Sequence, residues 1–124
     1  MNIYCVGNVL LKNDNLPLRF MDVLRSKFPK HTFLEADPNE NFIPEEGAVI
    51  IDTVVGATEV KLYTSPDDFT PAPHVSAHDY DLSFHLRFLQ KVGKLQSVRI
   101  IGIPQSMDEG KALTGVSHLL KKLE

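Results

Sequence analysis

The apolar residues of the chain fall into short blocks whose spacing predicts alternating strands and helices. The first block, NIYCV at 2–6, is rich in residues that favour β-structure and is followed by Gly7, so it predicts a buried strand. From Pro17 onward, apolar residues recur at helical spacing, which predicts a helix with proline in its first turn. The apolar positions of this helix are 20, 21, 24 and 28.

Three further blocks predict strands in the first half of the chain. HTFLEA (31–36) reads as a second strand, and the turn-forming residues of 37–47 then predict a loop. AVIID (48–52) is apolar until it ends in a carboxylate, which is typical of a central strand covered on both faces. VKLYT (60–64) alternates between apolar and polar residues, which favours a strand with one exposed face, at or near an edge.

In the second half of the chain, a long loop is followed by a predicted helix, strand and helix. The segment 65–78 contains three prolines and no periodicity, and loops of this length are often functional. DLSFHLRFLQKVG (81–93) predicts a helix, and VRIIGI (98–103) predicts another buried strand. TGVSHLLKKL (114–123) predicts a final helix with Thr114 as its N-cap.

The resulting order, β-α-β-β-β-α-β-α, predicts an α/β fold. Alternating elements favour a three-layer α/β/α sandwich in which helices cover both faces of a twisted, mainly parallel sheet of about five strands. The length of 124 residues, with no internal repeat or linker, predicts a single α/β domain over 1–124.

Composition narrows the class of protein. Hydrophobic residues make up 43% and charged residues 23%, which is typical of a globular chain and argues against disorder. The net charge of −3 is scattered, which argues against a nucleic-acid-binding protein. Cys5 is the only cysteine, MNIYCVGN lacks a signal-peptide pattern, and the apolar runs are far short of the ~20 residues that span a bilayer. We therefore expect a soluble cytoplasmic protein.

Three polar side chains are expected where strands end. Asp14 lies in GNVLLKNDN (7–15) after the first strand, Asp52 ends the strand 48–52, and His78 precedes the helix 81–93. Ligands of open α/β sheets bind outside the carboxyl ends of the strands, so these groups are expected to converge on one crevice. Two carboxylates and an imidazole suit a divalent transition metal, with nickel or zinc favoured by the imidazole.

Each of these residues also has a structural interpretation. Asp14 could cap the following helix, and His78 could cap a helix or pack against Tyr80. Asp52 could accept backbone N–H bonds in a tight turn, although a carboxylate after four apolar residues risks a costly burial. His74 lies four residues before His78, but the nearby prolines argue against a helical pair of zinc-binding histidines.

Several other chemistries are disfavoured. The chain has no thiolate cluster, and Cys5 lies within an apolar strand where its thiol would be poorly ionised. It contains no G-x-S-x-G elbow, P-loop or G-x-G-x-x-G fingerprint. A pair of neighbouring aspartates, as in aspartic proteases, stays open, but it would leave His78 without a role.

Four segments together resemble the hydrogenase maturation endopeptidases, which trim the C-terminus of the large subunit of nickel–iron hydrogenases. Their order agrees with that family, and they span most of the chain. The segments are YCVGNVLLKNDN, AVIIDTV, SAHDYDLSFHLRFL and IIGIPQSMDEGKALTGVSHLL.

The resemblance implies a metal-dependent peptidase of α/β/α fold whose nickel, or another divalent metal in its place, arrives bound to the substrate. The implied partner is a hydrogenase large-subunit precursor, with no role for nucleic acid or membrane insertion. The metal-binding and catalytic positions of the family fall on Asp14, Asp52 and His78.

The chain also departs from the family pattern. Its first loop reads Asn13-Asp14-Asn15 where the family usually has two acidic residues followed by glycine. This departure motivates a non-catalytic alternative, a precursor-binding or metallochaperone module of the same fold. A small nucleotide- or flavin-binding α/β domain is a second alternative, which the missing glycine fingerprint disfavours.

Overall fold

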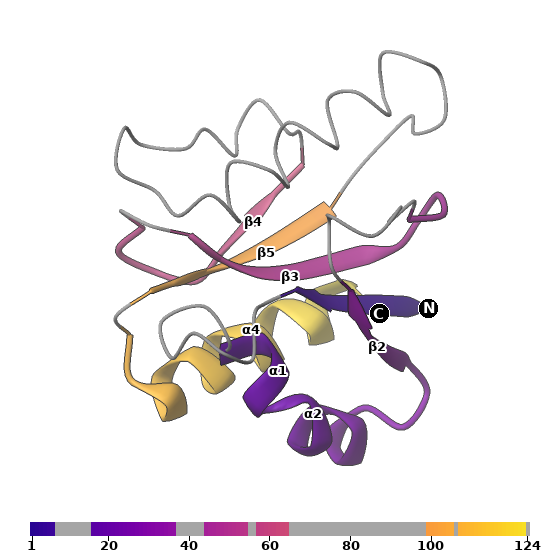
Figure 1. Cartoon of the computed structure of the whole chain (residues 1–124), viewed down its shortest axis with the longest axis horizontal. Helices are drawn as coiled ribbons and strands as arrows, with labels where there is room; N and C mark the ends of the chain where they lie inside the picture. The colour runs from indigo at the N-terminus through magenta and orange to yellow at the C-terminus, as the bar shows by residue number, and fades with distance from the viewer. Residues whose placement is uncertain (7–15, 37–43, 55–56, 65–98, 106, 124) are drawn as a thin grey trace.

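The computed structural model of the chain describes residues 1–6, 16–36, 44–54, 57–64, 99–105 and 107–123 (Figure 1). The helix expected over 81–93 and the loop expected over 65–78 lie outside these residues. The described elements are β1 (Asn2–Val6), α1 (Leu16–Arg19), α2 (Met21–Lys27), β2 (Thr32–Ala36), β3 (Val49–Val54), β4 (Lys61–Tyr63), β5 (Arg99–Pro104) and α4 (Glu109–Leu123).

The strands form one five-stranded sheet in the order β2-β1-β3-β5-β4. β2, β1, β3 and β5 are parallel to one another, whereas β4 pairs antiparallel with β5 at an edge. The predicted α/β sandwich with a mainly parallel sheet of about five strands is therefore confirmed. β3 is central and almost wholly buried, and the short β4 is a partly exposed edge strand, as their sequence patterns predict.

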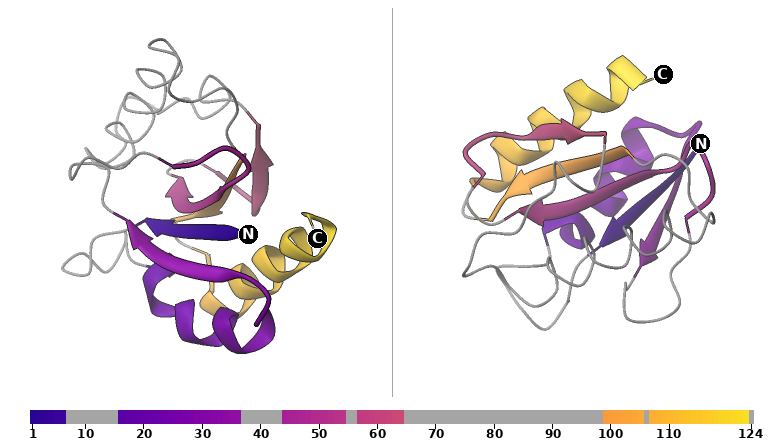
Figure 2. Two further views of the ribbon diagram at one scale, coloured as in Figure 1. Left: turned by 90° about the vertical axis from the view of Figure 1, so that its right-hand side faces the viewer. Right: turned by 90° about the horizontal axis from the view of Figure 1, so that it is seen from above.

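Alternate side chains of the strands point to opposite faces of the sheet. We call the face covered by α1, α2 and α4 the helix face (Figures 1 and 2). Its strand residues are Ile3, Cys5, Phe33, Val49, Ile51, Ile101 and Ile103. We call the other the second face, where buried Val6, Ala36, Ile50 and Ile100 pack with Tyr4, Val54 and Tyr63. Burial of each large apolar side chain contributes about 1.5–3 kcal/mol, so both faces stabilise the sheet.

The helix predicted after Pro17 is observed as two short helices that meet at Phe20. Phe20 leaves helical geometry, with φ −109° and ψ 17°, and is only 1% exposed. Phe20, Met21 and Leu24 all enter the core on the helix face, and positions with this spacing form the apolar stripe of an amphipathic helix.

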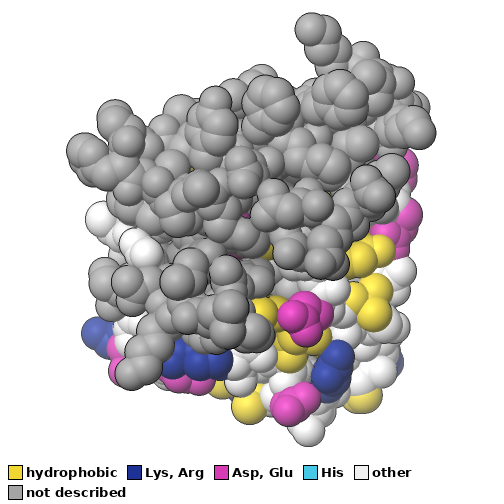
Figure 3. All heavy atoms as spheres, in the orientation of Figure 1, with side chains coloured by type: hydrophobic (Ala, Val, Ile, Leu, Met, Phe, Trp, Pro, Cys, Tyr) yellow, Lys and Arg dark blue, Asp and Glu magenta, His cyan; other side chains and the backbone are white. Residues whose placement is uncertain are grey.

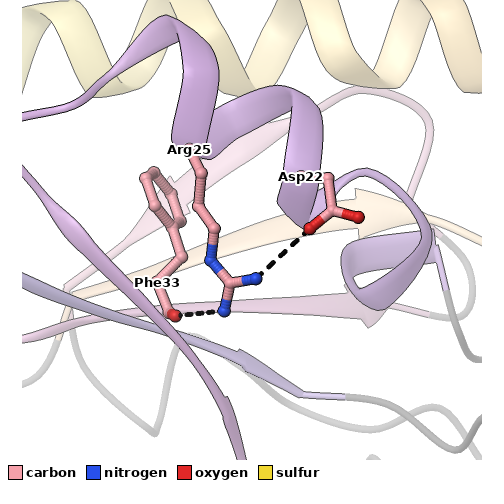
Figure 4. A network of polar contacts seen from close by, with 3 residues as sticks. All are labelled: Asp22, Arg25 and Phe33. Atoms are coloured by element: carbon pink, nitrogen blue, oxygen red, sulfur yellow. Dashed lines mark hydrogen bonds and ion pairs between the residues drawn. The ribbon is translucent and has the colours of Figure 1, made fainter.

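A side chain of α2 fixes the helix to the edge strand β2 (Figure 4). The Arg25 guanidinium contacts Asp22 Oδ1 at 3.2 Å and donates a 2.8 Å hydrogen bond to the carbonyl oxygen of Phe33. This bond satisfies a backbone group of an edge strand, which would otherwise be available to pair with another chain.

The last helix begins earlier than predicted. α4 starts at Glu109, and Asp108 caps it by accepting the Lys111 N–H at 3.2 Å. The prediction that Thr114 is the N-cap is wrong, because its hydroxyl donates to the Gly110 carbonyl within the helix at 2.9 Å. The polar first turn conceals the helix start, since apolar periodicity begins only at Ala112. No helix in the described part of the chain is long and apolar enough to cross a membrane.

Candidate active site

The sequence pattern had predicted that Asp52 ends its strand, but Asp52 lies inside β3. The strand continues through Thr53 and Val54 because these residues pair with Ile103 and Pro104 of β5. Asp52 itself is paired with Gly102. Since Ile50 and Val54 point to the second face, the Asp52 side chain points there too, near the carboxyl end of two central strands.

The carboxylate of Asp52 is completely buried, with 0% exposure. Its Oδ1 accepts the backbone N–H of Thr53 at 2.8 Å. A buried carboxylate is costly unless hydrogen bonds, an opposite charge or a metal compensate it. The structural interpretation of Asp52 is thus confirmed in part, since it does accept a backbone N–H, although in a strand and not in a turn.

The other two predicted site residues, Asp14 and His78, lie outside the described residues. β1 lies beside β3, with Cys5 opposite Ile51. Val6, the last residue of β1, therefore lies level with Asp52 near the carboxyl ends of these parallel strands. Within the ranges that the structure describes, no group of three or more His, Cys, Asp or Glu side chains could hold a metal ion. The convergence of Asp14, Asp52 and His78 therefore stays a prediction.

Two residues beside Asp52 were missed by the sequence analysis. Gly102, the partner of Asp52 in β5, is covered by the ring of Tyr63 from β4. A Cβ atom at Gly102 would lie 2.7 Å from Tyr63 Cε2 and 2.7 Å from Val54 Cγ2. The available signal was a glycine within the apolar strand RIIGIP, because such a glycine often marks a close approach.

A hollow of about 430 Å³ lies at the same edge of the sheet, beyond the ends of β3 and β5. The backbone N–H groups of Ala57 and Met107, which line it, donate to the carbonyl oxygens of Val54 and Pro104. Its volume is within the range of small-ligand sites, about 300–1,000 Å³. The residues that line it are Ala57, Thr58, Pro104, Met107, Asp108 and Lys111.

Cys5 is unsuited to nucleophilic chemistry. Its side chain is fully buried on the helix face, and burial raises the pKa of the thiol to about 12. At neutral pH it is therefore a thiol and not the reactive thiolate, as its apolar strand predicted.

The described surface offers mixed charge. In the view of Figure 3, acidic and basic side chains lie next to one another around the lower part of the molecule. This arrangement agrees with the scattered charge of the sequence and is unlike the basic stripe of a nucleic-acid-binding protein.

No protein-family model matches the sequence. No curated protein matches it closely in sequence. Solved structures do match in fold. The hydrogenase maturating endopeptidase HybD from E. coli is 18% identical, with a TM-score of 0.64 over 99% of this chain and 92% of that one.

Two further structures agree with this match. An uncharacterized protein from Wolinella succinogenes is 17% identical, with a TM-score of 0.61 over 98% of this chain and 94% of that one. The hydrogenase 3 maturation protease is 16% identical, with a TM-score of 0.60 over 99% of this chain and 88% of that one. The resemblance predicted from the sequence is thus confirmed at the level of structure: the chain has the fold of the hydrogenase maturation endopeptidases.

Proposed function

We propose that the protein is an endopeptidase that removes the C-terminal extension of a hydrogenase large-subunit precursor after nickel has been inserted. The observation that carries this proposal is Asp52, a buried carboxylate near the carboxyl end of a central parallel strand. It lies in a fold shared with HybD and with the hydrogenase 3 maturation protease. The proposal places the reaction in the cytoplasm, with residues 1–124 acting as one domain.

Asp52 is the described member of the proposed metal-contacting set, which also includes Asp14 and His78. Carboxylate oxygens and a neutral imidazole are suitable ligands for nickel and leave coordination positions open for the substrate. The hydrogen bond from the Thr53 N–H holds Oδ1 and fixes the carboxylate before substrate arrives. This fixed orientation reduces the entropy lost when the metal is bound.

Nickel is cargo of the substrate in this proposal, so the enzyme would recognise only precursors that contain it. A divalent metal can polarise a carbonyl group or activate a water molecule, and either would assist peptide cleavage. The protonated Cys5 thiol is no alternative nucleophile. Metal-activated water is therefore the proposed attacking group.

The test is mass spectrometry of a nickel-loaded precursor before and after incubation with the protein. We expect loss of the C-terminal extension with the wild type, and an intact precursor with Asp52→Asn or when nickel is omitted. Asp22→Asn is the matched control, because it makes the same chemical change at a carboxylate on the exposed surface of α2. Its activity should equal that of the wild type.

The same experiment distinguishes the proposed peptidase from the non-catalytic alternative suggested by the Asn13-Asp14-Asn15 loop. A precursor that binds the wild-type protein but keeps its full mass would identify a binding module or metallochaperone. It would contradict the proposed peptidase activity.

A further inference from the structure

The strand β2 turns one row of its backbone groups away from the sheet. β2 pairs with β1 on one side, and no other strand of the described residues pairs with its outer side. The Thr32 N–H donates to the Met1 carbonyl oxygen at 3.0 Å, so the backbone groups of Thr32 face β1. Backbone groups of successive residues in a strand face opposite sides, so those of Phe33 and Glu35 face outward.

One of these outward groups already has a partner within the chain (Figure 4). The Arg25 guanidinium of α2 donates a 2.8 Å hydrogen bond to the carbonyl oxygen of Phe33. Arg25 also contacts Asp22 at 3.2 Å, but the Asp22 side chain is 95% exposed, and such surface ion pairs contribute little. The bond to Phe33 is therefore the contact that holds the Arg25 side chain over the outer edge of β2.

The backbone of this outer edge is complementary to itself. Two copies of β2 that lie antiparallel about a twofold axis at Leu34 would place Phe33 of each copy opposite Glu35 of the other. In each such pair the two residues would exchange N–H···O hydrogen bonds, and the Phe33 carbonyl would be one of the acceptors. Leu34 would face Leu34 of the second copy at the closer, non-hydrogen-bonded position.

The side chains of β2 suit the same arrangement. Leu34 is a large hydrophobic residue with 37% exposure, and the pairing would bring it against an identical side chain. Glu35 would lie opposite a phenylalanine and not opposite another carboxylate, so no like charges would meet across the two strands. The edge therefore offers donors, acceptors and an apolar contact to a second copy of the chain.

We propose that Arg25 is a guard of the β2 edge, which keeps the chain from adding a second copy of itself by antiparallel β2–β2 pairing. Its guanidinium occupies the Phe33 carbonyl that the pairing needs in both copies, so an incoming strand would have to displace it. Exposed sheet edges favour such association, and charged side chains are a common means of blocking them. This inference does not depend on the proposed peptidase activity.

Sedimentation equilibrium of the full chain tests the guard. Arg25→Met keeps an unbranched side chain but has no donor, and it should lower the Kd of the dimer about 10- to 100-fold, because association no longer breaks an Arg25–Phe33 bond in each copy. Arg25→Ala should act in the same direction. Lys27→Met is the matched control, because Lys27 is an exposed charge of the same helix, and its dimer Kd should equal that of the wild type.

Two further substitutions, each combined with Arg25→Met, locate the new interface. Leu34→Lys should restore the wild-type Kd, because it places like charges opposite each other. Glu35→Pro should also restore it, because it removes an outward N–H that the pairing with β1 does not use. An unchanged Kd in both Arg25 variants would overturn the guard. A tighter dimer that persists with either further substitution would place the association elsewhere and would overturn it as well.

Discussion

The helix face and the second face are built from the same strands but carry different kinds of side chain. On β3, neighbouring residues Ile51 and Asp52 are equally buried, at 0% exposure, but they point to opposite faces. Ile51 joins the apolar core beneath α1, α2 and α4, where Cys5 is also sequestered. Asp52 lies on the second face, which also carries Tyr4 of the neighbouring strand β1 and Tyr63 of the edge strand β4.

The difference shows how stability and chemistry are separated in this fold. A change of one residue along a strand moves a side chain from one face to the other. Substitutions of the apolar residues on the helix face are therefore expected to change the free energy of unfolding, whereas Asp52→Asn on the second face should change the site with little effect on folding.

The largest effect is expected on the helix face. Phe20→Ala should lower the free energy of unfolding by about 3–5 kcal/mol, because it leaves a cavity at a fully packed aromatic residue. Urea unfolding provides the measurement. Val23→Ala, at a residue of α2 with 44% exposure, is the control and should change it by less than about 0.5 kcal/mol. Similar values for the two variants would contradict the helix-face core.

A second prediction concerns the close packing on the second face. Gly102→Ala should cost about 1–3 kcal/mol, because the added Cβ would overlap Tyr63 and Val54 at 2.7 Å. Gly110→Ala, in the first turn of α4, should cost less than Gly102→Ala, because its Cβ would meet only Asp108 Oδ2 at 3.2 Å, a side-chain atom that can shift, and because alanine favours helices. Thermal unfolding of both variants checks the contrast. A harmless Gly102→Ala would mean that the ring does not occupy this position.

A smaller effect is expected where α4 begins beside the hollow. Asp108→Ala should cost about 1 kcal/mol, because the Lys111 N–H loses its capping partner. Thr114→Ala, at the cap position predicted from sequence, should change stability by less than about 0.5 kcal/mol, since Thr114 is exposed within the helix. Chemical unfolding measures both. The reverse order would place the helix start at Thr114.

The smallest effect is a pH dependence of stability that involves Tyr4 on the second face. Glu45 accepts hydrogen bonds from Asn2 and from the Tyr4 hydroxyl, the latter at 2.7 Å. Burial acts to raise the pKa of Glu45, but these bonds outweigh it and leave the pKa below 4.5. Burial and then Glu45 raise the pKa of Tyr4 from 10.0 to about 12.

The directions of the two pKa shifts define the pH range in which both groups stabilise the fold. The lowered pKa of Glu45 stabilises the fold above pH 4.5, and this contribution is lost as pH falls through the folded value. The raised pKa of Tyr4 stabilises it below pH 10.0, and this contribution is lost as pH rises through about 12. The Tm difference between wild type and Glu45→Gln should therefore be constant between these limits and shrink in acid. A difference that grows below pH 4.5 would contradict the assignment.

The sequence pattern predicted the strands well because the continuous apolar blocks become buried strands, and the alternating block at 60–64 becomes the partly exposed edge strand β4. It misplaced boundaries where long-range pairing decides them. β3 continues past Asp52 because β5 offers Ile103 and Pro104 as partners, and no local pattern encodes this. The apolar pattern also missed the start of α4 at Glu109, because the first turn of this helix is polar, and the break at Phe20, which no local signal marks.

The candidate site was predictable only in part. A carboxylate after an apolar block was sufficient to identify Asp52. The contact of Tyr63 with Gly102 was not predictable, because it requires β4 to turn antiparallel and pair with a strand that follows it by more than 30 residues. Asp14 and His78 remain predictions from the sequence.

The most direct measurement is the mass of a nickel-loaded hydrogenase large-subunit precursor after incubation with wild-type protein or with Asp52→Asn. We expect the wild type to remove the C-terminal extension. Asp52→Asn should leave the precursor intact while unfolding at a temperature close to that of the wild type. Cleavage by Asp52→Asn at the wild-type rate, or no cleavage by the wild type, would contradict the proposed role of this buried carboxylate.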